Sequence, residues 1–150
     1  MPDAAIPHPA PTSVRTVLVA EDNETVAQLM SDLLRVWGYE VEVVSHGLAA
    51  VQRCAERAYD LVLMDCHMPV MDGWQATRAI RASEGVRRTP ILAITGEGDL
   101  QSCLEAGMDD YLQKPVRPTL LRTAMMRWLD RGGRRSSPPP VSAMTVPSGT

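Results

Sequence analysis

Short apolar runs alternate along the chain with longer stretches in which apolar residues recur at helical spacing. The runs have the length of strands and occupy residues 16–20, 40–44, 61–64 and 90–94, with a fifth that includes 111–112. Residues 40–44 alternate polar and apolar positions, so we expect this strand at an edge of a sheet. The other runs are almost wholly apolar, which is typical of parallel strands buried on both faces.

Helices are predicted between these strands. The first shows the clearest apolar stripe, which consists of Val26, Leu29, Met30, Leu33, Leu34 and Trp37. Gly38 follows at a position that suits the end of a helix. Residues 47–58 form a weaker helix and another begins after Gly73. A short helix ends near Gly107, and the last begins at Pro118.

Five consecutive strand–helix units indicate an α/β fold with helices on both faces of a parallel sheet. We expect a doubly wound, flavodoxin-like arrangement with strand order 2-1-3-4-5, whose functional crevice lies at the carboxyl ends of strands 1 and 3. Residues 14–130 form the expected domain. Residues 1–13 are rich in proline and residues 131–150 in glycine, serine and proline, so both segments are expected to be disordered.

The composition argues against several classes of protein. A net charge of −3 is unfavourable for nucleic-acid binding, and no apolar run approaches the roughly 18–20 residues of a membrane span. The first residues lack the basic start and apolar stretch of a secretory signal. The three cysteines, Cys54, Cys66 and Cys103, fit neither a disulfide framework nor a zinc pattern. We therefore expect a cytoplasmic protein.

Polar side chains of chemical interest follow four of the five strands. Glu21 and Asp22 follow the first strand, and Asp65 follows the third. Thr95 follows the fourth, and Lys114, the only lysine in the chain, follows the fifth. Because these strands are neighbours in the expected order, the five side chains are expected to converge. For Asp22 or Thr95 alone a helix N-cap is an equally good interpretation, but chance does not readily give one coherent chemistry at four strand ends.

The residue types indicate which chemistry this would be. Clustered carboxylates repel one another at close range, and a divalent cation would offset the repulsion. Oxygen ligands with room for phosphate oxygens favour Mg²⁺ over zinc. A carboxylate can also act as the nucleophile that takes up a phosphoryl group, while a lysine and a hydroxyl bind its oxygens. The pattern therefore predicts Mg²⁺-dependent phosphoryl transfer.

Four segments carry a further signal: VLVAEDN at 17–23, LVLMDCHMPVMDG at 61–73, ILAIT at 91–95 and AGMDDYLQKP at 106–115. In these segments the chain strongly resembles the receiver domain of two-component response regulators, and the resemblance covers about residues 14–130. The second and fourth segments are most similar to receivers of hybrid histidine kinases and phosphorelays.

The resemblance implies a role for each residue at the strand ends. Asp65 would be the phosphoacceptor and would also bind Mg²⁺. Asp22 would bind the metal directly, and Glu21 would do so largely through water. The backbone carbonyl of His67 would supply a further oxygen. Lys114 would pair with Asp65 and later with the phosphoryl oxygens.

A conformational switch is also implied by the resemblance. Thr95 would move towards the phosphoryl group and Tyr111 would rotate inward behind it, while the Lys114–Pro115 bond would be cis. The expected partners are a histidine kinase or histidine phosphotransfer protein, and a downstream protein at the face of helix 4, strand 5 and helix 5. We expect no nucleic acid, no membrane insertion, no turnover enzyme activity and no output domain in this chain.

Two other functions stay open. A haloacid-dehalogenase-like phosphatase also uses an aspartyl phosphate beside Mg²⁺, although its DxDxT motif does not follow the first strand here. A degenerate receiver could act only as a docking module. The segment between Thr95 and Tyr111 is a few residues shorter than the family pattern, so we expect a fourth helix of about two turns. Glu97 is expected near the mouth of the pocket.

Structural roles are expected for several other residues. The three tryptophans have aliphatic neighbours at helical spacing, which favours core packing. Asp72 and Gly73 are expected to shape the loop after Asp65. Asp109 and Asp110 are expected to be solvated in a turn.

Overall fold

The computed structural model describes residues 14–96 and 100–130, in which five parallel strands form one sheet with the order β2-β1-β3-β4-β5. The strands are β1 (Thr16–Ala20), β2 (Glu40–Val44), β3 (Leu61–Asp65), β4 (Ile91–Thr95) and β5 (Asp110–Gln113). The predicted fold class and strand order are therefore confirmed, with the alternating strand β2 at an edge. The predictions for residues 1–13 and 131–150, and for Glu97, lie outside the described residues.

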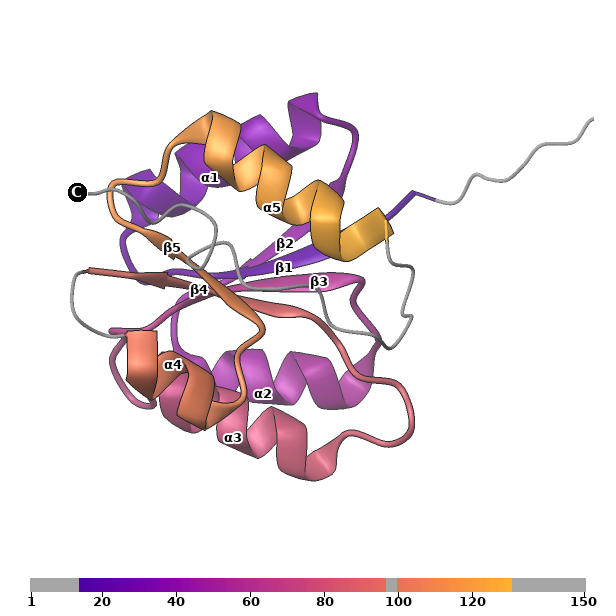
Figure 1. Ribbon diagram of the computed structural model, residues 1–150, viewed down its shortest axis with the longest axis vertical. Coiled ribbons are helices and arrows are strands. Elements are labelled where there is room, and N and C mark those ends of the chain that lie inside the picture. The colour runs from indigo at the N-terminus through magenta and orange to yellow at the C-terminus, as the bar shows by residue number, and fades with distance from the viewer. Residues whose placement is uncertain (1–13, 97–99, 131–150) are drawn as a thin grey trace, which may run out of the picture.

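The helices form two layers on opposite faces of the sheet (Figure 1). Helices α1 (Glu24–Val36) and α5 (Pro118–Asp130) cover one face. Helices α2 (Gly47–Glu56), α3 (Gly73–Ser83) and α4 (Leu100–Ala106) cover the other. Among these helices none is long and apolar enough to cross a membrane. The seven residues of α4 agree with the short fourth helix predicted from the sequence.

Local sequence signals fix where the helices begin. The side chains of Asn23, His46 and Asp72 each accept a hydrogen bond from a backbone N–H in the first turn of α1, α2 and α3. Asp72 and Gln75 complete a capping box. Gly38, just beyond α1, has a φ of +99°, which only glycine adopts readily.

The sheet divides the hydrophobic core into two halves. Along β1, Val17 and Val19 pack in the half that contains α1 and α5. Leu18 and Ala20 pack in the half that contains α2, α3 and α4. Every residue of β3 is buried because helices cover both faces of the central strand, which explains its unbroken apolar run up to Asp65.

The apolar stripe of α1 is only partly buried. Ala27, Met30, Ser31 and Leu34 are the buried residues of the helix. Leu29 keeps 65% of its surface exposed. The helical spacing read from the sequence is therefore confirmed, but one edge of the stripe faces solvent.

The prediction that Asp109 and Asp110 are solvated in a turn is wrong. Asp109 pairs with Arg81 and with Arg88, each at an N–O distance of 2.7 Å. Asp110 is buried and accepts a hydrogen bond from Nε1 of Trp128 at 3.0 Å. These partners lie between 18 and 28 residues away along the chain, so a local sequence pattern does not predict the contacts. The two carboxylates fasten the start of β5 to both helical layers.

Candidate functional site

Three carboxylates meet at the carboxyl edge of the sheet. Glu21 and Asp22 follow β1, and Asp65 is the last residue of the neighbouring strand β3. One oxygen from each lies within 4.8 Å of the others. Glu21 is 3% exposed and Asp65 is 1% exposed, whereas Asp22 lies at the surface. The pairing of β1 with β3 thus brings acidic groups from distant parts of the chain into one buried cluster.

Glu21 has one oxygen that is hydrogen-bonded and one that is not. Oε2 accepts a hydrogen bond from the backbone N–H of Asn23 at 3.1 Å. Oε1 is buried and has no hydrogen-bond partner among the described residues. Burial raises the pKa of Glu21 to about 7, the hydrogen bond from Asn23 opposes the rise, and the charge of Asp65 adds to it. The ionised form of Glu21 is therefore poorly stabilised by the protein alone.

Lys114 reaches Asp65 from the end of β5. Its Nζ lies 3.1 Å from Oδ1 of Asp65, and the same oxygen accepts a hydrogen bond from the backbone N–H of His67 at 3.1 Å. The other oxygen of Asp65, Oδ2, is buried and makes no hydrogen bond within the described part of the chain. Partial burial favours a lower pKa for Lys114, but the hydrogen bond and charge of Asp65 outweigh it and raise the pKa.

Thr95 and Tyr111 lie on the two neighbouring strands. Thr95 is the last residue of β4 and is buried, and its side chain interacts with the neighbouring thiol of Cys66. Its backbone oxygen accepts a hydrogen bond from the N–H of Lys114 at 2.8 Å, which holds the ends of β4 and β5 together. Tyr111 is half-buried against the core half that contains α4. The Lys114–Pro115 bond is cis.

The loop after Asp65 is held in place through its backbone. The N–H of Gly73 donates to the oxygen of Cys66 at 2.9 Å. A Cβ added to Gly73 would lie 2.3 Å from the backbone oxygen of Asp65, so only glycine fits there. The N–H of Gly47 donates to the oxygen of Met71 at 3.0 Å, which ties the loop to the start of α2.

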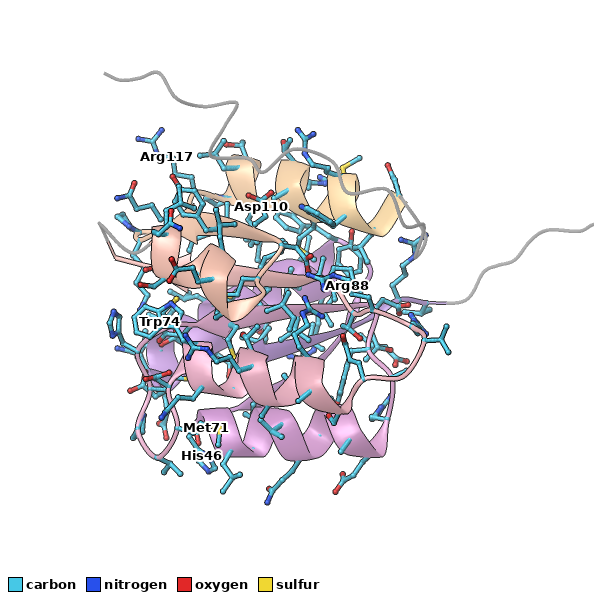
Figure 2. The ribbon with its side chains drawn as sticks, turned by 60° about the horizontal axis from the view of Figure 1, so that its bottom comes forward. His46, Met71, Trp74, Arg88, Asp110 and Arg117 are labelled. Atoms are coloured by element: carbon cyan, nitrogen blue, oxygen red, sulfur yellow. The ribbon has the colours of Figure 1, made fainter. Side chains whose placement is uncertain are left out.

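One feature of this loop and one at the start of α3 have no sequence signal. Val70 has a φ of +72°, and the N–H of Met71 donates to the oxygen of Pro69 at 2.7 Å, so the chain makes a strained γ-turn around a β-branched residue. Trp74 is not only a core residue, because its ring packs edge to face against His67 with centroids 5.0 Å apart. Figure 2 shows Trp74 and Met71 at the same end of the molecule.

The donor set of the cluster fits a hard divalent cation. All three side chains offer carboxylate oxygens, and two of them have a buried oxygen without a hydrogen-bond partner in the described part of the protein. Hard oxygen ligands of this kind suit Mg²⁺ better than zinc or copper. The site therefore combines a position for a cation, a carboxylate oxygen that is open to reaction, an ammonium group and a hydroxyl group.

Known proteins with similar sequences are signalling proteins. The model of the response regulator receiver domain family matches residues 17–126. Sensor protein GacS of Pseudomonas syringae pv. syringae is 40% identical over 141 residues, which cover 90% of this chain and 16% of GacS. Hybrid signal transduction histidine kinase B of Dictyostelium discoideum is 38% identical over 128 residues, which cover 76% of this chain and 6% of the kinase. The chain thus spans less than a fifth of the length of these relatives.

A solved structure covers the same region. The receiver domain of sensor histidine kinase PA1611 from Pseudomonas aeruginosa PAO1 is 42% identical, with a TM-score of 0.74 over 79% of this chain and 99% of that one. Its crystal structure has a magnesium ion coordinated in the active site cleft. By sequence, fold and the residues at its strand ends, this chain belongs to the response regulator receiver domain family of two-component systems.

Proposed function

We propose that this receiver domain accepts a phosphoryl group on Asp65 from the phosphohistidine of a histidine kinase or a histidine phosphotransfer protein. One observation carries the proposal: Oδ2 of Asp65 is buried among carboxylates and makes no hydrogen bond within the described residues. Buried oxygens are normally hydrogen-bonded, so an open one indicates a reacting or ligating atom. Lys114 occupies the other oxygen, which leaves Oδ2 to form the new bond.

The transfer is a substitution at phosphorus. A bond forms between Oδ2 of Asp65 and phosphorus while the phosphorus–nitrogen bond of the phosphohistidine breaks, and a proton replaces the phosphoryl group on the departing imidazole. The negative charge on the phosphoryl oxygens must be neutralised during the transfer. Lys114 Nζ, now 3.1 Å from Asp65, is within reach of such an oxygen, and Thr95 supplies a hydroxyl donor.

Mg²⁺ is the proposed cofactor, and when bound it supplies positive charge beside the phosphoryl oxygens. Asp22 and Asp65 would bind it directly. Glu21 would bind it largely through water, and His67 through its backbone carbonyl. The open oxygen and raised pKa of Glu21 support a cation at this place, because a cation stabilises the ionised carboxyl.

Phosphorylation is proposed to change the face made by α4, β5 and α5. Thr95 would move towards the phosphoryl group and Tyr111 would rotate inward behind it. The helices of this face carry partly exposed apolar side chains: Leu104 on α4, and Leu120 and Met126 on α5. A downstream protein that covers these side chains would sense the switch through the position of α4.

The phosphodonor is proposed to dock along α1. A groove lined by Val26, Leu29 and Leu33 from α1 and by Pro118 from α5 leads to the acidic cluster. Because Asp65 is almost fully buried, a donor histidine must project into this cleft, and a helix that carries it would cover the exposed edge of α1. Docking of the phosphodonor would explain why the apolar stripe of α1 is left partly exposed at Leu29.

The proposed setting is a cytoplasmic phosphorelay. Proteins similar to this chain include a sensor protein and a hybrid histidine kinase. The three cysteines are free thiols, which is the usual state in a reducing compartment.

Phosphoryl labelling tests the assignment of Asp65. With Mg²⁺ and a small acyl phosphate, or with a phosphorylated donor protein, intact-protein mass spectrometry should show one added phosphoryl group per chain. Asp65→Asn should remove this labelling, whereas Asp32→Asn, which changes an exposed carboxylate on α1, should keep it. Labelling of Asp65→Asn at the wild-type level would contradict the proposal.

Two outcomes would favour the other functions. Steady multiple-turnover hydrolysis of phosphate monoesters would support a haloacid-dehalogenase-like phosphatase, although the receiver family and the position of Asp65 at the end of β3, not of β1, weigh against it. Failure to bind Mg²⁺ in a calorimetric titration would support a docking module. The cluster of Glu21, Asp22 and Asp65 weighs against that second alternative.

A further inference from the structure

We propose that Cys66 and Cys103 form a reversible disulfide when the protein meets hydrogen peroxide, and that this bond fixes α4 to the strand end that carries the phosphoacceptor. The two Sγ atoms lie 3.5 Å apart, and both residues are fully buried. A disulfide bond measures about 2.05 Å, so the sulfurs need to approach by only about 1.5 Å. The fold therefore places two thiols in contact although 37 positions separate them in the sequence.

The pair connects the phosphoryl site to the proposed output face. Cys66 directly follows Asp65, and its thiol contacts the thiol of Cys103 and interacts with the side chain of Thr95. Cys103 lies in α4. Contacts thus run without a gap from the pocket to the helix. A covalent bond between the sulfurs would restrain α4 and would displace the thiol that Thr95 contacts.

The two cysteines differ in how they can meet an oxidant. The N–H of Cys66 donates to the oxygen of Ile94 at 3.0 Å and its own oxygen accepts from Gly73, so it cannot leave the core unless the end of the sheet opens. Cys103 lies in a helix of seven residues, which is too short to be stable alone and whose local opening exposes the thiol. We therefore assign the first oxidation to Cys103.

The chemistry needs one equivalent of hydrogen peroxide. The sulfur of Cys103 attacks one peroxide oxygen, so that an S–O bond forms, the O–O bond breaks and one water leaves, which gives a sulfenic acid. When α4 closes again, the sulfur of Cys66 attacks the sulfur of Cys103. The S–S bond forms, the S–O bond breaks, and the hydroxyl leaves as a second water with the proton of the Cys66 thiol. Two thiols are oxidised and peroxide is reduced to two waters.

Peptide mapping tests the disulfide without any phosphodonor. The full chain is treated with hydrogen peroxide, digested with trypsin without reductant, and analysed by mass spectrometry. Cleavage after Arg53 and Arg57 separates Cys54 from the other two cysteines. We expect a linked pair of peptides that contains Cys66 and Cys103 and is lost with dithiothreitol. Cys103→Ala should abolish the pair, and Cys54→Ala should keep it.

Phosphoryl labelling of the oxidised protein tests the consequence for the site. We expect the oxidised wild type to be labelled about fivefold more slowly than the reduced protein, with recovery after dithiothreitol, because small displacements beside a reacting group are costly. Cys103→Ala after the same peroxide treatment should keep its rate, which controls for methionine oxidation.

Three results would overturn the proposal. The first is a folded, peroxide-treated protein without the Cys66–Cys103 peptide pair, and the second is disulfides to Cys54 that form as readily as this pair. The third is an oxidised protein that is labelled as fast as the reduced protein. The labelling experiment rests on the proposed function, whereas the peptide map does not. Absence of labelling in the reduced protein would contradict that function, and the peptide map would still decide whether the disulfide forms.

Discussion

Glu21 is expected to make the protein less stable as the pH rises towards neutrality. Its carboxyl has a pKa of about 7 in the folded protein, against an ordinary value of 4.5. Between these two values the folded protein holds a proton that the unfolded chain has lost, so the free energy of unfolding decreases as pH increases. The stabilisation is fully present below the pKa of the unfolded chain and is lost as the pH rises through the pKa of the folded protein.

The magnitude follows from the width of this interval. Each pH unit between the two values is worth about 1.4 kcal/mol, so the whole interval is worth about 3 kcal/mol. A comparison of about pH 5 with about pH 8 captures most of this difference, because it spans most of the interval. Mg²⁺ should offset the loss above neutrality, because a cation that binds only the folded state adds about 2.7 kcal/mol at 100 times its Kd.

Urea denaturation at the two pH values, with and without Mg²⁺, measures both effects. Glu21→Gln has no ionisable group at this position, so its free energy of unfolding should not decrease between the two pH values. Glu56→Gln changes an exposed carboxylate on α2 and should behave as the wild type. The reasoning is refuted if Glu21→Gln shows the same decrease as the wild type, or if the wild type without Mg²⁺ is equally stable at both pH values.

Three further substitutions test separate features. In urea denaturation, Val70→Gly should raise the free energy of unfolding by about 1 kcal/mol, because glycine adopts a φ of +72° without strain. Val86→Gly, at a fully exposed position, should give no such gain. In the same assay Trp128→Phe should lower the free energy of unfolding by about 1–2 kcal/mol, because it removes the hydrogen bond of 3.0 Å to the buried Asp110. Lys114→Arg should keep the melting temperature and slow phosphoryl labelling about tenfold, because a planar guanidinium does not replace a compact ammonium 3.1 Å from a carboxylate.

Each of these expectations can fail in a distinct way. A loss of stability in Val70→Gly would mean that the γ-turn is not strained. An unchanged free energy of unfolding in Trp128→Phe would mean that its hydrogen bond contributes nothing net. A wild-type labelling rate in Lys114→Arg would remove the special role of the only lysine.

The sheet and the residues at its edge could be predicted because their signals are local. Each strand is an apolar run, and the polar side chains of interest stand directly at the strand ends. Strand order then brings the ends of β1, β3, β4 and β5 together, so the meeting of Glu21, Asp22, Asp65 and Lys114 needs no knowledge of side-chain packing.

Other features depend on contacts between distant segments or on backbone geometry. The partners of Asp109 lie on α3 and in the loop before β4, and the contact between Cys66 and Cys103 arises only when α4 packs against the sheet. The positive φ of Val70 belongs to a residue type that usually avoids it. A single sequence carries no marker for any of these.

A core divided by a buried sheet also limits how substitutions influence one another. Leu34 and Ile80 lie in different halves of the core with the sheet between them. The losses of stability caused by replacing each with alanine should therefore be additive. Leu34 and Leu129 lie in the same half of the core, where the surrounding side chains can rearrange around both cavities. The two losses of stability need not be additive there. The layer of α1 and α5, along which the phosphodonor is proposed to dock, can therefore diverge to fit a new partner while the packing beneath α4 stays as it is.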